Sequence, residues 1–574
     1  MSTNQELKRL QDDFAAKRIT RRQLWKGAAA LGVSGMWIAA LERGAIAGPA
    51  PVRNQLLARG QDAATTFIIA VEGDVDTFDP GNTVGSKTAQ TTLQNVFDQL
   101  TQYQIIEGTT PDGQPYRTVD TTQIVPMIAE EWHWDGPNMV FTIRDGVTYA
   151  NGDPIDANTH VAGYTRILEG TVSSWLIGMG GTIADSSAFQ APDAKTFVIA
   201  LTQQNPITPR NNVMHNNSVL NPLEVEANAT EDDPWAAEYY RQNLAMGNGP
   251  YKLDAYLPGD SITLTANELY YGEQPFFTTV ILKIVTEPVQ RVQLLQQGDV
   301  DFATLLPRTE IESLSADPNL KVLTIPSPFL TMLSMNNKMP PFDNKLVRQA
   351  VNYAAPYQVI IDEVYKGNAQ PGGSLVPNGM PTSDFSTNPY TTDLEKAKAL
   401  LSEAGFPDGE GLPEIKLSYR IGDAAWERMA ILMQAQLANI GMDITIEPLA
   451  YAVYNEQQQA EGGSKMQFWI DEWLSWVNDP YYHMTWLAHS GSSNNYPKMS
   501  IPRVDEIIDT YTIFDEGEER DAASVEAQAL IIDDATYCYL CQPNWLLVTR
   551  ADIDGYVYYN DELPRYYHFN RVTA

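Results

Sequence analysis

The part of the sequence with the clearest chemical character is residues 467–480, which read Q-F-W-I-D-E-W-L-S-W-V-N-D-P. This stretch holds three tryptophans, three carboxylates and one asparagine, Asn478. Large aromatic rings beside carboxylates either pack in a core or line a binding surface, where the rings stack on a ligand or on a cation. Both interpretations stay open at this point, because the stretch alone favours neither strongly.

Two elements have to position this aromatic stretch. Residues 466–470 predict a strand, and the tryptophans Trp473 and Trp476 follow it in an irregular loop. Asp479 and Pro480 then form a helix-start signal, with Asp479 as N-cap and Pro480 as the first helical residue. We therefore expect both tryptophans to lie on a loop between a strand and a helix.

Common catalytic motifs are missing from the sequence. It has no G-x-S-x-G, no phosphate-binding loop and no H-E-x-x-H. Its six histidines are scattered, and His483 and His489 are six residues apart, off a common face of the predicted helix. We predict no enzyme activity, no catalytic residue, no metal and no cofactor. A secreted carbohydrate hydrolase with paired carboxylates stays open as an alternative, as does a binding module that feeds a sensor kinase.

The two cysteines, Cys538 and Cys541, lie three residues apart in a segment that predicts a strand. Three residues apart on a regular strand, their side chains face opposite sides, which disfavours a disulfide. A single C-x-x-C is also weak evidence for a metal site. We interpret them as two small buried residues.

Length and charge narrow the class of protein. A chain of 574 residues is longer than one hydrophobic core usually serves, so two or three lobes are expected. The formal net charge is −34. A body this acidic repels nucleic acid and anionic membrane surfaces, and we expect neither as a partner.

The N-terminal residues are a targeting segment. Paired Arg21 and Arg22 precede an uncharged apolar run, residues 28–41, and a small-x-small sequence that ends at Ala47. This arrangement resembles a twin-arginine export signal, and the apolar run is short for a membrane span. We expect cleavage after Ala47, a linker over residues 48–62, and a soluble protein outside the cytoplasm.

The body of the chain alternates strands and helices. Segments before residue 287 predict an α/β lobe with strands at 66–71, 252–257, 261–266 and 280–285 and helices from 87 and 157. After Pro288 the alternation becomes regular, with helices at 288–297 and 426–440, helices capped by Asp343 and Asp393, and strands at 415–419 and 443–449. This regularity predicts a mostly parallel sheet in a second lobe.

Several segments, in this order along the chain, carry a family resemblance. They are D-T-F-D-P at 76–80, F-T-I-R-D-G-V-T-Y-A-N-G-D-P-I-D-A at 141–157, G-N-G-P-Y at 247–251, P-P-F-D-N-K-L-V-R-Q-A-V-N-Y-A from 340, E-K-A-K-A-L-L-S-E-A-G-F-P-D-G at 395–409 and W-L-S-W-V-N-D-P at 473–480. Together they resemble the extracytoplasmic solute-binding proteins of ABC transporters, in the peptide, nickel and opine group. The resemblance covers nearly all of the chain after residue 65.

The resemblance implies an α/β, two-lobed periplasmic-binding-protein fold with mixed sheets and a ligand cleft between the lobes. Lobe I would comprise residues 63–286, with an inserted subdomain at about 100–195, and lobe II residues 287–540. Residues 541–574 would return to lobe I, with hinges near 286–289 and 541–544. The implied protein is a periplasmic monomer that captures a small, peptide-like or related solute and delivers it to an ABC permease.

The resemblance also points to ligand-binding residues within the aromatic stretch. Trp473 matches the family's pocket tryptophan. Trp476 stands where peptide-binding relatives carry an aspartate that pairs with the ligand's ammonium group, so we expect many peptides to fail to bind. Asn478 is a further candidate, whereas Asp479 is kept as a helix cap.

Further cleft candidates lie elsewhere in the chain. The loop after the first strand points into the cleft in the family, which makes Phe78, Asn82 and Thr83 candidates. Arg420, at the end of a predicted strand, would suit a ligand carboxylate, with a surface ion pair as the alternative. Asn336 could contact either ligand or backbone.

Overall fold

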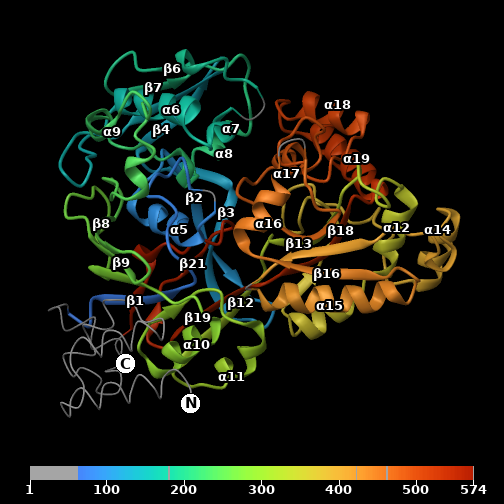
Figure 1. Cartoon of the computed structure of the whole chain (residues 1–574). Coiled ribbons are helices and arrows are strands. Elements are labelled where there is room, and N and C mark those ends of the chain that lie inside the picture. The colour runs from blue at the N-terminus through green and yellow to red at the C-terminus, as the bar shows by residue number, and fades with distance from the viewer. Residues whose placement is uncertain (1–61, 84, 179–180, 422, 461–462, 573–574) are drawn as a thin grey trace, which may run out of the picture.

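The structure is a computed structural model that describes residues 62–572 except 84, 179–180, 422 and 461–462. The predicted export signal and most of the predicted linker lie outside the described residues. The described chain forms two α/β lobes with a subdomain on the first. Figure 1 shows lobe I and its subdomain on the left and lobe II on the right.

Lobe I is built on one seven-stranded sheet. Its strands, in spatial order, are β12 (Leu320–Ile325), β19 (Trp545–Arg550), β11 (Phe302–Ala303), β1 (Thr66–Val71), β10 (Thr279–Ile284), β9 (Ser261–Ala266) and β8 (Tyr251–Leu257). Strand β1 is buried at every position and pairs in parallel with β10 and β11. The helices of this lobe are α5 (Lys87–Val96), α10 (Pro288–Gln297) and α11 (Ile311–Ser315).

The G-N-G segment belongs to the core of lobe I. A Cβ on Gly247 would lie 2.1 Å from the carbonyl oxygen of Val96, so only glycine allows this approach of the chain to α5. Between the glycines, Asn248 accepts a hydrogen bond from the backbone N–H of Asp98 at 3.0 Å. This motif therefore fixes the end of α5 against the strands that follow it.

The subdomain contains a four-stranded and a three-stranded sheet. The first has the order β4 (Ala129–Asp135), β5 (Asn138–Ile143), β7 (Thr196–Ile199) and β6 (Phe189–Gln190), and the second β2 (Thr101–Thr109), β3 (Pro115–Pro126) and β21 (Val557–Tyr558). Its helices are α6 (Ala157–Gly170), α7 (Ser174–Ile177), α8 (Thr208–Asn211) and α9 (Pro222–Asn228). Helix α6 starts with a capping box between Asp156 and Thr159, as the predicted cap indicated. A two-stranded pair, β20 (Ile553–Asp554) with β22 (Asn570–Arg571), lies near the end of the chain.

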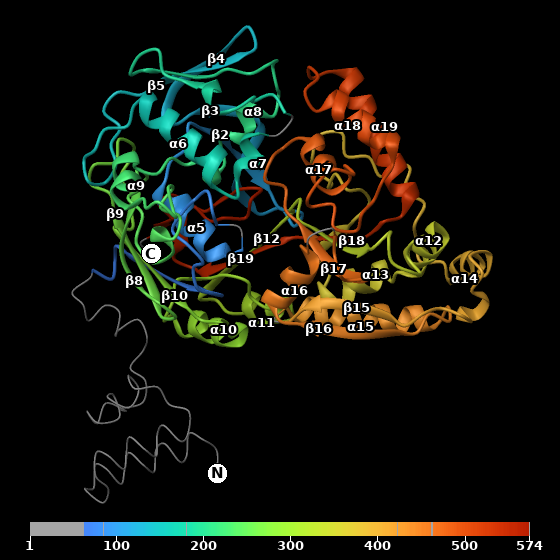
Figure 2. The ribbon, with the colours of Figure 1, turned by 45° about the horizontal axis from the view of Figure 1, so that its top comes forward.

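Lobe II has a six-stranded sheet with apolar clusters on both faces. Its order is β14 (Ala369–Pro371), β18 (Tyr537–Pro543), β13 (Leu330–Met335), β17 (Phe468–Trp473), β15 (Ile415–Arg420) and β16 (Ile444–Leu449). Helices α12 (Lys345–Ala354), α13 (Tyr357–Val359), α14 (Leu394–Glu403), α15 (Ala424–Ala438), α16 (Tyr451–Gln458), α17 (Pro480–Leu487), α18 (Pro502–Tyr511) and α19 (Glu518–Asp534) complete the lobe. Figure 2 shows α15 on one side of this sheet and α18 and α19 on the other.

The sheet of lobe II is mixed, and the prediction of a mostly parallel sheet was wrong. Only β15 pairs in parallel, with β16 and β17, while the other three pairings are antiparallel. The regular alternation predicted helix and strand positions well, but the chain enters and leaves this lobe through antiparallel strands. Strand direction depends on these distant pairings, which local periodicity does not encode.

The chain crosses between the lobes later than expected. Strands β11 and β12 belong to the sheet of lobe I, so the first crossing lies at residues 326–329 and not at 286–289. Helix α10 returns the chain to the sheet it came from, which keeps residues 287–325 in lobe I. The second crossing is at Asn544, between β18 and β19, within the expected 541–544 window.

The two cysteines are free and buried, as expected, but the reason given for it was wrong. Opposite Thr331 and Met332 the register of β18 slips, so that Tyr539 and Cys541 pair with consecutive residues. The bulge turns the strand, and both Cys538 and Cys541 join the same apolar cluster. Burial raises the pKa of the Cys538 thiol to about 12, which makes it a poor nucleophile.

Candidate functional site

Both lobes direct the carboxyl ends of their parallel strands toward the junction between them. In lobe I, β11 and β12 are both antiparallel to β19, so they run parallel to β1, and β12 ends directly before the crossing. In lobe II, Trp473 at the end of β17 pairs with Leu330, the first residue after the crossing, and β15 runs parallel to β17. The carboxyl edge of open α/β sheets is where ligands bind. We call this meeting of the two carboxyl edges the seam.

Charged residues of lobe I surround a small void at the seam, with a cavity volume of about 10 Å³. Glu72 directly follows β1 and accepts a hydrogen bond from the Thr304 hydroxyl at 2.6 Å. Lys87 pairs with Glu562 at 3.2 Å and lies over the ring of Trp545. Glu562 also accepts from the hydroxyl of Ser327, in the first crossing, at 2.6 Å. This side of the seam is therefore polar, charged and partly enclosed.

On the lobe II side, Arg420 ends β15, as predicted. Its Nη2 lies 3.1 Å from Oε1 of Glu472, and its guanidinium stacks 4.6 Å from the ring centroid of Trp426. Glu472 reaches Arg420 because the two parallel strands end side by side. Asp423 lies close by and caps α15 by accepting from the N–H of Ala425 at 2.8 Å.

Trp473 and its neighbour Asp471 are held by lobe II itself. Trp473 is half-buried, donates its indole N–H to Nδ1 of His483 at 2.8 Å and packs on Tyr482. Asp471 accepts from the indole of Trp469 at 2.9 Å and from Gln458 at 3.0 Å, and burial raises its pKa. The strand β17 thus extends to Trp473, three residues beyond the predicted end. The hydrogen bonds of Asp471 are made within lobe II.

Trp476 lines a second, somewhat larger void between the lobes, with a cavity volume of about 20 Å³. It is the one lining residue from lobe II, and the rest come from α5, the subdomain and the C-terminal segment 559–567. The ring of His215, from the subdomain, contacts Trp476 edge-on at 6.2 Å between centroids. Asn478 is buried nearby, and its Oδ1 has no hydrogen-bond partner among the described residues. Trp476 therefore lies between the lobes, as the sequence indicated.

Asp479 is the N-cap of α17, as predicted, and it also takes part in contact between the lobes. It accepts from the N–H of Tyr481 and receives Nη2 of Arg520 at 2.9 Å from both carboxylate oxygens. Arg210, on α8 of the subdomain, approaches Asp479 at 3.8 Å and pairs with Glu516 of lobe II at 2.6 Å. The helix cap is thus one end of a charged bridge between the lobes.

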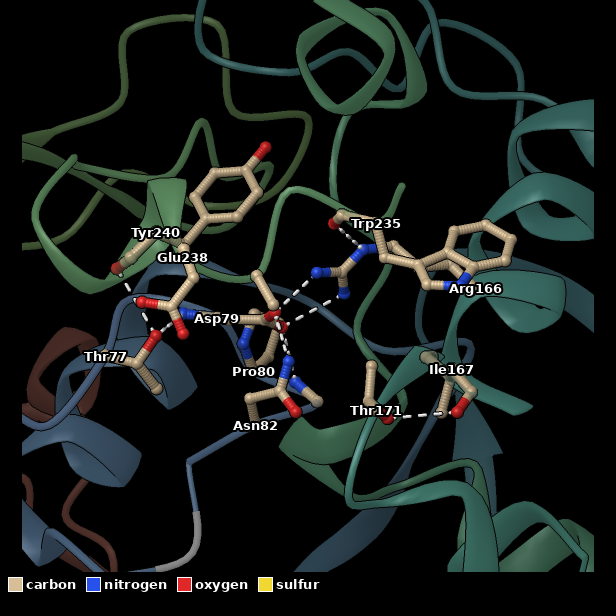
Figure 3. Close-up of polar contacts among 12 residues, drawn as sticks. Thr77, Asp79, Pro80, Asn82, Arg166, Ile167, Thr171, Trp235, Glu238 and Tyr240 are labelled. Atoms are coloured by element: carbon tan, nitrogen blue, oxygen red, sulfur yellow. Dashed lines mark hydrogen bonds and ion pairs between the residues drawn. The ribbon is translucent and has the colours of Figure 1, made fainter. Parts of the chain in front are cut away.

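The candidates in the first loop are held by contacts within lobe I and its subdomain. Phe78 is fully buried and packs edge-on against Tyr256, which makes it a core residue and not a cleft residue. Figure 3 shows Asn82 donating to the carboxylate of Asp79, which also forms a paired contact with Arg166 of α6. The hydroxyl of Thr83 donates to Asp76 at 3.0 Å. This loop joins lobe I to its subdomain.

Asn336 lies at the wrong end of the sheet to contact a ligand at the seam. It follows the last residue of β13, whose first residue is next to the crossing. Its side-chain amide donates to the carbonyls of Ser464 and Met466 at 2.9 and 3.2 Å. Of the two alternatives for Asn336, the structure therefore supports contact with the backbone and not with a ligand.

Sequence reasoning missed Glu72, Lys87 and Glu562 at the seam. Glu72 could have been found, because it directly follows a buried strand that predicts the first strand of a parallel sheet. No local sequence pattern could have identified Glu562, because its partner Lys87 is 475 residues away in the chain. Its place depends wholly on the return of the C-terminal segment to lobe I.

The chain is similar in sequence to periplasmic binding proteins of known bacteria. It is 27% identical over 516 residues to a probable D,D-dipeptide-binding periplasmic protein of Escherichia coli, a match that covers 88% of this chain and 94% of the relative. It is 22% identical over 517 residues to the nickel-binding periplasmic protein of the same organism, covering 86% and 94%. No helix in the described part of the chain has the length and apolar character to cross a membrane.

A solved structure shares the fold. The ABC transporter-associated periplasmic binding protein of Helicobacter pylori, in complex with the peptide STSA, superimposes with a TM-score of 0.77 at 22% identity, covering 88% of this chain and 98% of that one. The family model of the bacterial extracellular solute-binding proteins, family 5, matches residues 123–495. The chain therefore belongs to the family 5 bacterial extracellular solute-binding proteins.

Proposed function

We propose that this protein is the solute receptor of an ABC importer and binds a small polar solute at the seam. The observation that carries the proposal is that both lobes present charged residues there, from the carboxyl ends of their parallel strands. Glu72, Lys87 and Glu562 come from lobe I, and Arg420 and Glu472 from lobe II. A solute that enters the seam from the open form would contact both lobes when they close about it.

The solute differs from an ordinary peptide in this proposal. A buried ammonium group needs a carboxylate partner, because an unpaired buried charge is costly. Trp476 occupies the position where peptide-binding relatives carry that aspartate, and Asp471 already accepts hydrogen bonds from Trp469, Ser334 and Gln458. Most linear peptides should therefore bind weakly or not at all.

The receptor acts by binding and performs no chemistry. Solute binding favours closure of the lobes, and the closed form docks on a membrane permease that receives the solute. The carboxylates at the seam, Glu72, Glu472 and Glu562, each bind a neighbouring side chain, which fits a structural role for them better than a role as general acid or base. We further propose a periplasmic monomer, released by cleavage after Ala47.

Native mass spectrometry of protein purified from its own periplasm tests the proposal. A retained small molecule, lost on denaturation, is the expected result, and N-terminal sequencing should begin at Gly48. A thermal-shift panel of di- to hexapeptides should give mostly small shifts, because a true ligand at 100-fold its Kd adds about 2.7 kcal/mol. Large shifts with many peptides would refute the predicted selectivity, and turnover of a glycoside or other substrate would refute the receptor.

Two matched substitutions locate the solute. Thr88 lines the void at the seam, and Val213 lines the larger void beside Trp476. Thr88→Phe should fill the first void and abolish solute retention, while Val213→Phe should leave retention intact. The reverse pattern would move the site to the Trp476 void. Unchanged circular dichroism in both variants serves as the folding control.

A further inference from the structure

Arg308 differs from the charged residues at the seam already described. It begins a short 3-10 turn, Arg308–Glu310, just after β11 at the carboxyl edge of lobe I. Three residues before it, Leu305 has a positive φ of 45°, a conformation that costs energy for a residue with a side chain. Arg308 is half-buried, yet its Nη1 is shielded from solvent and has no hydrogen-bond partner among the described residues.

Other buried arginines of the described chain have their charges matched. Arg166, Arg348, Arg520 and Arg565 each contact a carboxylate, respectively Asp79, Asp534, Asp479 and Asp561. Arg291 has no carboxylate contact but donates to four backbone carbonyls. Arg308 has neither arrangement within the described residues. A guanidinium nitrogen buried without a partner is costly, which indicates that a partner is supplied from outside the chain.

The surroundings of Arg308 place it across the seam. The titratable groups near Arg308 are the neutral Tyr365 and Cys541 and the carboxyl group of Asp423, all of lobe II, and the carboxyl group of Glu562 of the C-terminal segment. Both carboxylates already have partners, because Asp423 caps α15 and Glu562 is held by Lys87 and Ser327. Burial lowers the pKa of the Arg308 guanidinium, but arginine stays charged at any physiological pH.

We propose that Arg308 binds a carboxylate of the transported solute, with the solute held between Arg308 on lobe I and the carboxyl edge of lobe II. This inference rests on the proposed function. A planar guanidinium fits a carboxylate through two parallel hydrogen bonds. The two acidic neighbours disfavour a doubly charged phosphate there and leave a singly charged carboxylate as the better match. Arg420, the sequence-based candidate for this role, is instead neutralised by Glu472.

The first test needs no knowledge of the solute. Solute-free Arg308→Met should be at least as heat-stable as the solute-free wild type, since the variant removes a buried nitrogen that has no hydrogen-bond partner among the described residues and keeps an apolar stem. The matched variant Arg420→Met breaks an ion pair and should not stabilise. A clear loss of stability in solute-free Arg308→Met would assign Arg308 a structural role and overturn the proposal.

The second test measures binding. Native mass spectrometry should find solute retention in the wild type, strongly reduced retention in Arg308→Met and intermediate retention in Arg308→Lys, which keeps the charge but loses the fork. The expected loss of affinity in Arg308→Met is about 10- to 100-fold, the range of a charge-assisted hydrogen bond. Equal retention in Arg308→Met and wild type would overturn the proposal.

Chemical derivatisation identifies the group that Arg308 binds. The molecule extracted from denatured wild-type protein is treated with acidic methanol, which adds a methyl group to each carboxylate. A retained molecule that gains no methyl group would overturn the carboxylate assignment while leaving the receptor function standing. If the natively purified wild type retains no small molecule, the proposed function fails, and this inference fails with it.

Discussion

The two internal boundaries of this molecule are built differently. Where lobe I meets its subdomain, Arg166 of α6 donates to both carboxylate oxygens of Asp79 and to the carbonyl of Trp235 (Figure 3), and the side chains of Arg166 and Asp79 are both buried. Between the lobes, Nη1 of Arg210 lies as far as 3.8 Å from Oδ2 of Asp479, and Nη1 of Arg308 has no hydrogen-bond partner among the described residues. The central arginine of the first boundary is fully paired within the protein, whereas Arg308 at the second boundary is not.

This difference indicates which boundary moves. A fully paired buried network is expensive to separate, because each group loses its partner before water can replace it. Contacts that are long, partly exposed or missing cost little to open. We therefore expect the subdomain to move with lobe I as one body, and the lobes to open at the seam. The following predictions test this contrast.

The largest effect is expected at the boundary between lobe I and its subdomain. Asp79→Ala would leave the buried guanidinium of Arg166 without its carboxylate, which should destabilise the protein by about 3–5 kcal/mol. Urea unfolding followed by tryptophan fluorescence measures the change. A shift no larger than that of a surface variant would show that this boundary is not held by the pair.

An acid-dependent effect is expected at the contact between His215 and Trp476. Burial lowers the pKa of His215 to about 4, with Asp561 and Arg565 as the charged groups near it. The unfolded chain binds a proton near pH 6.5 and the folded chain does not, so stability falls as the pH drops from 6.5 to 4, by up to about 3 kcal/mol for this residue.

His215→Gln isolates that contribution, because glutamine has no proton to gain in this range. Its melting temperature should fall less steeply than that of the wild type between pH 6.5 and 4. The buried His160 and His483 and the half-buried His568 also have lowered pKa values and should keep part of the slope. Parallel pH profiles for variant and wild type would mean that His215 does not titrate across folding.

A smaller effect is expected where Arg210 bridges the lobes. Glu516 is largely exposed, so the bridge should contribute about 1 kcal/mol or less. Arg210→Ala should shift the solute-free protein toward the open form, seen as a larger radius of gyration in small-angle X-ray scattering, with little change in unfolding. Arg241→Ala, which breaks a surface pair within lobe I, is the matched control and should leave the radius unchanged.

The smallest effect is expected on the outer surface of the subdomain. Lys195 pairs with Asp145, and both side chains are more than half exposed. Lys195→Ala should leave the unfolding midpoint and the radius of gyration unchanged within error, because water and salt screen such a pair. A measurable loss would mean that ion pairs stabilise this acidic protein regardless of burial, and the contrast drawn above would lose its basis.

Local signals allowed much of the fold to be predicted from sequence. Strand 66–71, strand 261–266 and helix 288–297 were predicted at their observed bounds, the last because Pro288 starts it and Gly298 ends it in a left-handed conformation. What failed were the pairings between distant segments. No local pattern tells whether β12 joins β19 of lobe I or a strand of lobe II, so the boundary at residue 287 was wrong.

The candidate site shows the same limit. The aromatic stretch marked the junction between the lobes, yet the partner of Trp473 is His483 on the next helix and the partner of Arg420 is Glu472 on a neighbouring strand. The residue types predicted that Trp473 would take part in an aromatic contact and Arg420 in a polar one. Whether a contact serves the protein or a solute depends on packing, which the sequence does not display.

The position of β19 has a consequence for how the protein is made. Lobe II lies on one continuous piece of chain, from β13 to β18, and can fold as soon as that piece is complete. Lobe I begins at residue 66 but lacks β19, between β12 and β11 of its sheet, until residues 545–550 are added. The first lobe to be synthesised is therefore the last to be completed, and a chain that stops before residue 545 would leave its sheet divided and its solute site unformed.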